Sequence, residues 1–184
     1  MKVERKEVRV TVREGYQILL RGQAEWLCPI ERPRMRDFYE RLVGTCMRWA
    51  EEVHGEHLRK EFLNLESVRE KSRFRTQQYR FLMRVPWEDG QHASVVCESE
   101  LTGQWHEPQK SYYRTAQMWN LAEELILPMP QILGRFGGGI TKQMLPFSPD
   151  GLYFDGNALL LFRNPTEQSH FVEERLLPPP TEKK

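Results

Sequence analysis

The spacing of apolar residues changes near residue 73, and this change limits the folds that the chain can adopt. Before it, apolar residues follow Pro33 at steps of three and four, which indicates an amphipathic helix that begins at a proline. Gly55 weakens this helix, so we expect one long helix with a bend, or two helices, ending near Glu70. The stripe expected to face the core comprises Met35, Phe38, Leu42, Cys46, Trp49, Val53, Leu58, Phe62 and Leu65.

Beyond residue 73 the apolar period is two, which is typical of half-buried strands. Tyr79, Phe81 and Met83 share one face, the turn residues Asp89-Gly90 follow, and a second alternating run ends at Thr102. This pattern predicts an antiparallel hairpin. The other expected elements are strands at 8–13, 16–27 and 111–120, a short helix at 129–136, a hairpin of 152–154 with 158–162, and a last strand at 171–177.

Together these elements predict an α+β fold. Its mainly antiparallel sheet, a meander plus a C-terminal hairpin, would pack on one long N-terminal helix and a short helix. We expect a single domain over residues 1–177, with strands and the long helix in 1–72 and the sheet-rich part in 73–177. The proline-rich residues 178–184 are expected to form a disordered tail.

The composition of the chain limits which binding partners and which cellular compartment we expect. Lys+Arg (27) nearly balances Asp+Glu (26), unlike the strongly basic domains that bind nucleic acid. No apolar run is long enough for a membrane helix. Charges near the N-terminus disfavour a signal peptide, so we expect a cytoplasmic protein with three reduced cysteines and neither nucleic acid nor membrane as partner. The oligomeric state stays open.

Two groups of residues resemble ligand sites, but structural roles are favoured for both. Glu51, His54 and His57 could share a helix face, yet a di-iron site needs a second helical copy, so we expect a solvated helix end and no metal. The glycines of 134–139 follow a helix rather than a strand, which is the reverse of a phosphate-binding loop. They predict a flexible connector, and no cofactor is expected.

Charged runs on the expected strands also favour a simple interpretation. The basic residues of 69–84 alternate with Phe74, Tyr79 and Phe81, as on some RNA-binding sheets, but these aromatic residues are expected to point into the core. Glu98 and Glu100 share one strand face and could form an acid/base pair, although a solvated face is commoner. We therefore expect no catalytic residues here.

The connection after the second strand of the hairpin is the most suggestive loop. It runs from Gly103 to Pro108 and carries Trp105 and His106 between two expected strands. Aromatic residues on loops held by rigid strands are common contact points. Thr102, Gly103, Trp105 and His106 are the candidate binding residues, and the alternative is a Trp105 ring that packs over the sheet end.

The order of strands and motifs from Ser94 onward resembles the extracytoplasmic domain of lysozyme-binding anti-sigma factors, which also accompanies some peptidoglycan deacetylases. That family has a loop like Thr-Gly-Gly-Ala-His-Gly after a strand; here Thr102, Gly103 and His106 match it, whereas residues 104, 105 and 107 differ. Residues 121–133 resemble the segment that leads into the family's short helix. Residues 153–167 resemble its closing pattern, Tyr-Leu-Thr-x-x-Gly-Leu-x-Phe-x-Phe-Asn-Pro-Tyr-Glu.

This resemblance implies an α/β fold of antiparallel sheet and helices that acts as a binding module without catalysis of its own. We expect a non-catalytic binding or regulatory module that recognises a protein or polymer through the Gly103–Pro108 edge. Lysozyme recognition is not carried over, because the loop differs and no export signal is expected. Two alternatives stay open: a hydrolase of cell-wall or carbohydrate material, and a structural subunit that oligomerises through a sheet edge.

Overall fold

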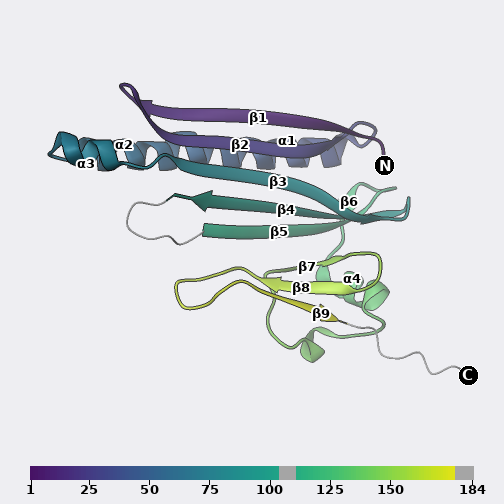
Figure 1. Ribbon diagram of the computed structural model, residues 1–184. Coiled ribbons are helices and arrows are strands. Elements are labelled where there is room, and N and C mark those ends of the chain that lie inside the picture. Colours follow the sequence, from purple (N-terminus) through teal and green to yellow (C-terminus); the bar gives the residue numbers. More distant parts are fainter. Residues whose placement is uncertain (104–110, 177–184) are drawn as a thin grey trace, which may run out of the picture. The chain divides into compact units, whose positions relative to one another are not determined.

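The computed structural model describes residues 1–103 and 111–176, and it has the α+β fold that the sequence predicts (Figure 1). Six strands form one sheet in the order β1-β2-β3-β4-β5-β6. β1 and β2 pair antiparallel, as do β5 and β6, whereas β2 and β3 are parallel. The strands are β1 (Val3–Glu14), β2 (Gln17–Pro29), β3 (Gln77–Glu88), β4 (His92–Thr102), β5 (Ser111–Asn120) and β6 (Leu125–Ile126).

The parallel pair requires a long crossover, because a tight turn can join only antiparallel neighbours. Helices supply it: α1 (Pro33–Arg48) and α2 (Gly55–Leu63) flank a π-helical segment, η1 (Trp49–His54), and α3 (Val68–Arg73) leads into β3. Figure 1 shows α1 running alongside β2. The expected long helix with a bend is therefore present, and its regular hydrogen bonding changes over η1 rather than at Gly55 alone.

The buried stripe of this helix differs from the predicted one. The residues of α1 and η1 that face the core are Met35, Tyr39, Val43, Met47 and Ala50. Phe38, Leu42 and Cys46 are half-buried, whereas Trp49 and Val53 are 41% and 62% exposed, so the assignment of Trp49 and Val53 to the core was wrong. Two apolar rows lie side by side on α1, and the row with the long methionines and Tyr39 fits the sheet.

Two glycines let the helices approach the sheet closely. A Cβ on Gly22 of β2 would lie 2.5 Å from Val10 Cγ2 and 3.4 Å from Met47 Cε. A Cβ on Gly55 would lie 2.7 Å from Val12 Cγ2. The side chains of β1 and α1 thus fill the space that larger residues would need, and helix and strands interlock at these positions.

A polar cluster lies beneath the sheet in the same part of the chain. The hydroxyl of Tyr79 is hydrogen-bonded with Cys46 and Ser99, and the Tyr79 ring is 5% exposed. His54 Nε2 donates to Gln77 Oε1 at 2.7 Å, and the His54 ring stacks on Trp49. Burial is the main cause that raises the pKa of Tyr79, and it also raises the pKa of the Cys46 thiol.

The chain divides into two compact units. One comprises Val3–Leu82 with Glu98–Tyr112, and it contains β1, β2 and the helices of the crossover. The other comprises Met1–Lys2, Met83–Cys97 and the chain from Tyr113 onward. None of the helices in the described part of the chain combines the length and hydropathy needed to span a bilayer.

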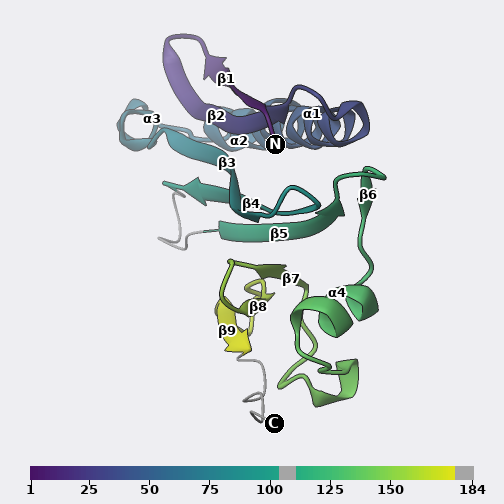
Figure 2. The same cartoon turned by 90° about the vertical axis from the view of Figure 1, so that its right-hand side faces the viewer.

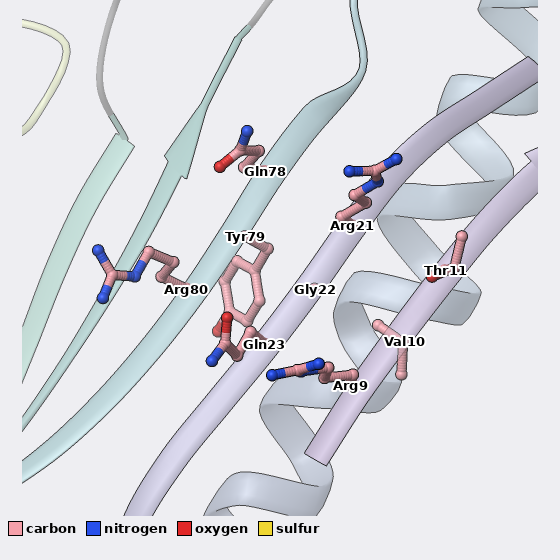
Figure 3. A pocket seen from close by; sticks show the side chains of 9 residues that line it. All are labelled: Arg9, Val10, Thr11, Arg21, Gly22, Gln23, Gln78, Tyr79 and Arg80. Carbon is pink, nitrogen blue, oxygen red and sulfur yellow. The ribbon is translucent and has the colours of Figure 1, made fainter. Parts of the chain in front are cut away.

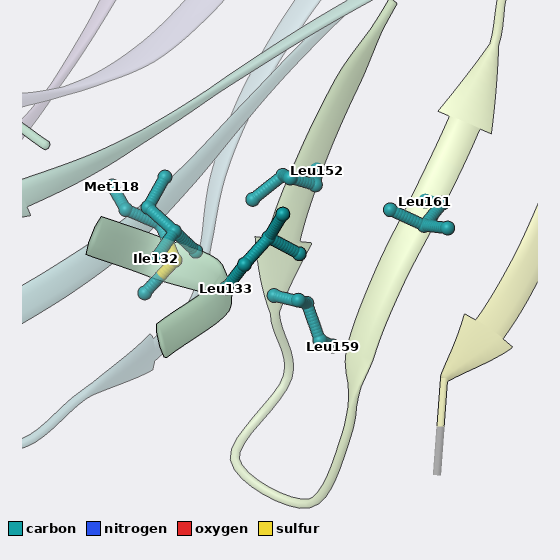
Figure 4. Close-up of a cluster of buried hydrophobic side chains, with 6 residues drawn as sticks. All are labelled: Met118, Ile132, Leu133, Leu152, Leu159 and Leu161. Atoms are coloured by element: carbon teal, nitrogen blue, oxygen red, sulfur yellow. The ribbon is translucent and has the colours of Figure 1, made fainter. Parts of the chain in front are cut away.

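The second unit contains a three-stranded antiparallel sheet, β7-β8-β9, and the short helix α4 (Met129–Phe136). Its strands are β7 (Gly151–Phe154), β8 (Leu159–Arg163) and β9 (Val172–Leu176), preceded by the short 3-10 turn η2 (Lys142–Met144). The side chains of α4, β7 and β8 meet in one apolar cluster (Figure 4). Its buried members are Met118, Ile132, Leu133, Leu152, Leu159 and Leu161.

A buried arginine ties the last strand to this unit. Arg114 is 8% exposed, and its guanidinium carbon lies 4.6 Å from the ring centre of Phe171 and 5.5 Å from that of Phe162. It donates to the carboxylate of Glu173 on β9, which also accepts from the Tyr153 hydroxyl. The aromatic rings and the carboxylate together offset the free-energy cost of removing the Arg114 guanidinium from water.

Most elements expected from the sequence are confirmed. β5 and α4 have the predicted bounds, both hairpins are present, and the first strand is longer than predicted. β3 begins at Gln77, so Phe74 lies before the strand. The last strand is confirmed over Val172–Leu176, while the expected tail at 178–184 lies outside the described residues.

Alanine substitutions at two helical glycines test how closely the helices pack against the sheet. Gly44→Ala, on a side of α1 with no atom near the new Cβ, should raise the free energy of unfolding by about 0.5–1 kcal/mol through helix propensity. Gly55→Ala should lower it by about 1–2 kcal/mol, because the new Cβ meets Val12. Urea denaturation of both variants measures the difference, and a gain in stability for Gly55→Ala would contradict the close approach.

Burial of Tyr79 predicts a loss of stability at alkaline pH. Because its pKa is raised in the folded state, its contribution is complete below the unfolded value, about 10, and is lost as pH rises above that value. The free energy of unfolding should therefore fall less steeply between about pH 8 and 11 in Tyr79→Phe than in the wild type. Tyr16→Phe, at a fully exposed turn position, is the control, and equal slopes for all three proteins would contradict the prediction.

Candidate functional site

The face of β1, β2 and β3 that lies opposite the buried side chains of β3 is polar, and we call it the open face. Partner residues in the ladder lie side by side on it: Thr11 pairs with Arg21, which pairs with Gln78. In the neighbouring row Arg9 pairs with Gln23, which pairs with Arg80. Three strands thus place three arginines and two glutamines within two adjacent rows, held by backbone hydrogen bonds.

A shallow hollow of about 430 Å³ lies over these rows. Figure 3 shows Arg9, Arg21 and Arg80 extending from β1, β2 and β3 respectively around it. Its lining contains three arginines and no acidic residue. A hollow of this kind attracts negatively charged groups, because the cations are fixed on a rigid support.

The next row toward the start of β1 is acidic, and it neutralises part of this charge. Glu7 pairs with Glu25 across β1 and β2, Arg9 donates to Glu7, and Arg5 donates to Glu25. The hydrogen bond from Arg5 is the main cause that lowers the pKa of Glu25, and the charge of Arg80 adds to it. The Gln23 amide donates to both carboxylates, at 3.3 Å to Glu7 and 2.9 Å to Glu25.

Arg21 and Arg80 differ from Arg5 and Arg9. Both are exposed, and neither forms an ion pair with any residue in the ranges 1–103 and 111–176. Gln78, beside Arg21 in the ladder, likewise makes no side-chain hydrogen bond within those ranges. These groups keep their donors available for a ligand.

The predicted binding residues are only partly within the described chain. Thr102 ends β4 and is half-buried, and Gly103 follows it with a φ of +88°. Gly103 lies against the start of β3, because a Cβ there would be 3.1 Å from Thr76 O and 3.4 Å from Gln77 Cα. Trp105 and His106 lie outside the described residues, so their role stays a prediction.

The other candidate sites considered from the sequence are not assembled in the described residues. No group of three or more His, Cys, Asp or Glu side chains there could hold a metal ion. His54 is engaged with Gln77, and His57 Nε2 lies 3.8 Å from Glu61. Glu98 accepts a hydrogen bond from the Tyr112 hydroxyl at 2.6 Å.

The basic residues of 69–84 indicated only part of the candidate site. Tyr79 and Phe81 are buried as expected, whereas Arg80 between them lies on the open face. Arg9, Arg21, Gln23 and Gln78 were not selected as site residues. Their alternation with apolar residues indicated an exposed strand face, but no local signal showed that β2 and β3 are neighbours.

Substitutions at Gly103 and Gly90 distinguish the effect of a positive φ from the effect of a close contact with neighbouring atoms. Both have φ above +80°, but a Cβ on Gly90 meets no atom within 4 Å. We expect Gly90→Ala to lower the free energy of unfolding by about 1–2 kcal/mol, and Gly103→Ala to lower it further, since its Cβ also meets the backbone at Thr76. Urea denaturation compares them, and a smaller loss for Gly103→Ala would contradict this placement of the β4 end.

Comparison with known proteins identifies related folds. No protein-family model matches the sequence, and no curated protein matches it. A crystal structure of a DUF3298 family protein from Pseudomonas aeruginosa PAO1 is similar, with a TM-score of 0.57 and 11% identity over 96% of this chain and 90% of that one. A DUF3298 member from Bacteroides fragilis NCTC 9343 has a TM-score of 0.54 and 10% identity over 95% and 90% of the two chains. The chain therefore shares the fold of proteins from a family of unknown function.

Proposed function

We propose that this chain is a non-catalytic binding or regulatory module that recognises a protein or polymer through the open face and the adjoining end of β4. The observation that carries the proposal is the pair of exposed guanidinium groups, Arg21 and Arg80, that have no ion-pair partner among the described residues. Strands in fixed register hold both groups, so little conformational freedom of the backbone is lost when a ligand binds.

The two parts of this surface are continuous along β3. Gly103 lies against Thr76 and Gln77, and Gln78 is the next residue of the strand and lines the hollow. A ligand on the open face would therefore reach the point at which the connection from Thr102 begins. This arrangement supports the use of both the arginines and the predicted Thr102–His106 segment.

The resemblance to the anti-sigma-factor and deacetylase-associated domain fits the same role. In that family the domain is expected to bind rather than to catalyse, and a loop like Thr-Gly-Gly-Ala-His-Gly follows one of its strands. Here the exposed cations lie on the strands, so the ligand would contact a sheet face as well as a loop. The surface is open rather than enclosed, which suits a macromolecular ligand better than a small buried one.

Binding should depend on the open face and not on cations in general. The labelled chain is applied to an array of peptides and an array of polysaccharides, and retained ligands are compared for the wild type, Arg80→Gln and a Trp105→Ala/His106→Ala double variant. Arg80→Gln should weaken retention by about fivefold, the size expected for losing one exposed charged contact. The double variant should weaken retention as well, because Trp105 and His106 belong to the proposed binding segment.

Arg69→Gln is the matched control, because Arg69 is also an exposed arginine but lies on α3. It should leave retention unchanged. If Arg80→Gln and the Trp105→Ala/His106→Ala variant both retain the same ligands as strongly as the wild type, the proposed function is overturned.

A further inference from the structure

The two unpaired arginines of the open face have a defined spacing. Arg21 is the ladder partner of Gln78, and Arg80 is the partner of Gln23, so Arg21 and Arg80 are diagonal neighbours on β2 and β3. With strands about 4.8 Å apart and a rise of about 3.3 Å per residue, their Cα atoms are about 8 Å apart. Both side chains lie on the same face of the sheet.

This spacing fits an extended peptide with acidic residues at alternate positions. Alternate side chains of an extended chain point to the same side and are about 6.6 Å apart, which the flexible arginine stems can accommodate. A guanidinium group binds a carboxylate through two parallel hydrogen bonds, which suits one arginine for each acid. The neighbouring Thr11 and Gln78 can hydrogen-bond with the backbone of such a peptide.

The charges around the hollow limit how far an anionic ligand can extend. Glu7 and Glu25 form the next row, where they are already paired with Arg9 and Arg5, so that row offers no available cation to a longer anionic ligand. Two carboxylates can lie on Arg21 and Arg80 without entering that row. A second hollow of about 580 Å³ on the outside of α1 is less selective, because its lining combines Asp37 and Glu40 with Arg41 and Arg48.

The open face also differs from a surface for single-stranded nucleic acid. Such surfaces combine cations with aromatic rings on which bases stack. The aromatic residue among those lining the hollow is Tyr79, and its ring is buried with its hydroxyl beside Cys46 and Ser99. Among the described residues that line the hollow, no exposed aromatic ring accompanies the arginines.

We propose that the open face binds an acidic peptide segment in extended conformation, with carboxylates on alternate residues paired to Arg21 and Arg80. This inference rests on the proposed function and names the ligand class for the same site. Arg21 and Gln78 hold the first acidic residue and the adjoining backbone, and Arg80 holds the second. The acidic row at Glu7 and Glu25 sets the limit of the negatively charged stretch.

Fluorescence anisotropy with synthetic peptides tests the assignment. The probe is a fluorescein-labelled Thr-Glu-Thr-Glu-Thr peptide, and it is compared with a Thr-Glu-Glu-Thr-Thr isomer, a Thr-Gln-Thr-Gln-Thr analogue and an oligothymidine of similar length. The alternating probe should bind most tightly, and Arg21→Gln and Arg80→Gln should each reduce its affinity by about fivefold. Arg21→Lys should keep part of the affinity, because it retains charge but not the two parallel hydrogen bonds.

Arg69→Gln again serves as the control and should leave the affinity unchanged, and thermal melting of each variant verifies that it is folded. The acidic-peptide assignment is overturned if the isomer, the glutamine analogue or the oligothymidine binds as tightly, if the two arginine variants bind like the wild type, or if no saturable binding occurs up to about 1 mM probe. If instead an array ligand of another class is lost in Arg80→Gln, the proposed function stands and only this assignment fails.

Discussion

The parallel pairing of β2 with β3 is the constraint on which the N-terminal part of the fold depends. It requires the chain to leave β2, cross over one face of the sheet and return in the same direction, and α1, η1, α2 and α3 make this crossover. The crossover covers only one face. The polar open face exists because none of these crossover helices lies on the other side of the same strands.

Helix and sheet can meet only because of their complementary shapes. Gly22 and Gly55 provide room for Val10 and Val12, and Met47 reaches over Gly22. The π-helical turn between Trp49 and His54 adds to this fit, since it changes which residues face the strands after α1. Trp49 stacks on His54 and lies near Tyr79, so even its exposed ring contributes to a polar cluster beneath the sheet.

The sequence was most informative where the signal is local. The Asp89-Gly90 turn, the alternation in β4 and β5, and the proline at the start of α1 predicted elements that the structure contains. The buried face of α1 was predicted wrongly, because Phe38 and Leu42 form an apolar row beside that of Met35 and Tyr39. Choosing between two adjacent rows requires the shape of the partner surface, which no helical period encodes.

The candidate site was harder to predict for a related reason. Arg21 and Gln78 are far apart in the sequence, and their contact depends on the length and path of the helical crossover. Each strand by itself has an unremarkable solvated face, and the row of charges arises only when the register is known. Gly103, by contrast, was selected from a local pattern, and it lies beside the strand that carries Gln78 and Arg80.

The arginine buried among Tyr153, Phe162 and Phe171 makes the far end of the chain indispensable to its own unit. The carboxylate that receives its hydrogen bond belongs to Glu173, three residues before the last described residue, Leu176. A proteolytic cut just upstream of Glu173 would remove most of β9, with Leu176 of the apolar cluster, and would also leave the buried Arg114 guanidinium without its carboxylate partner. Loss of this segment would therefore destabilise the unit through an uncompensated buried charge as well as through lost apolar contacts.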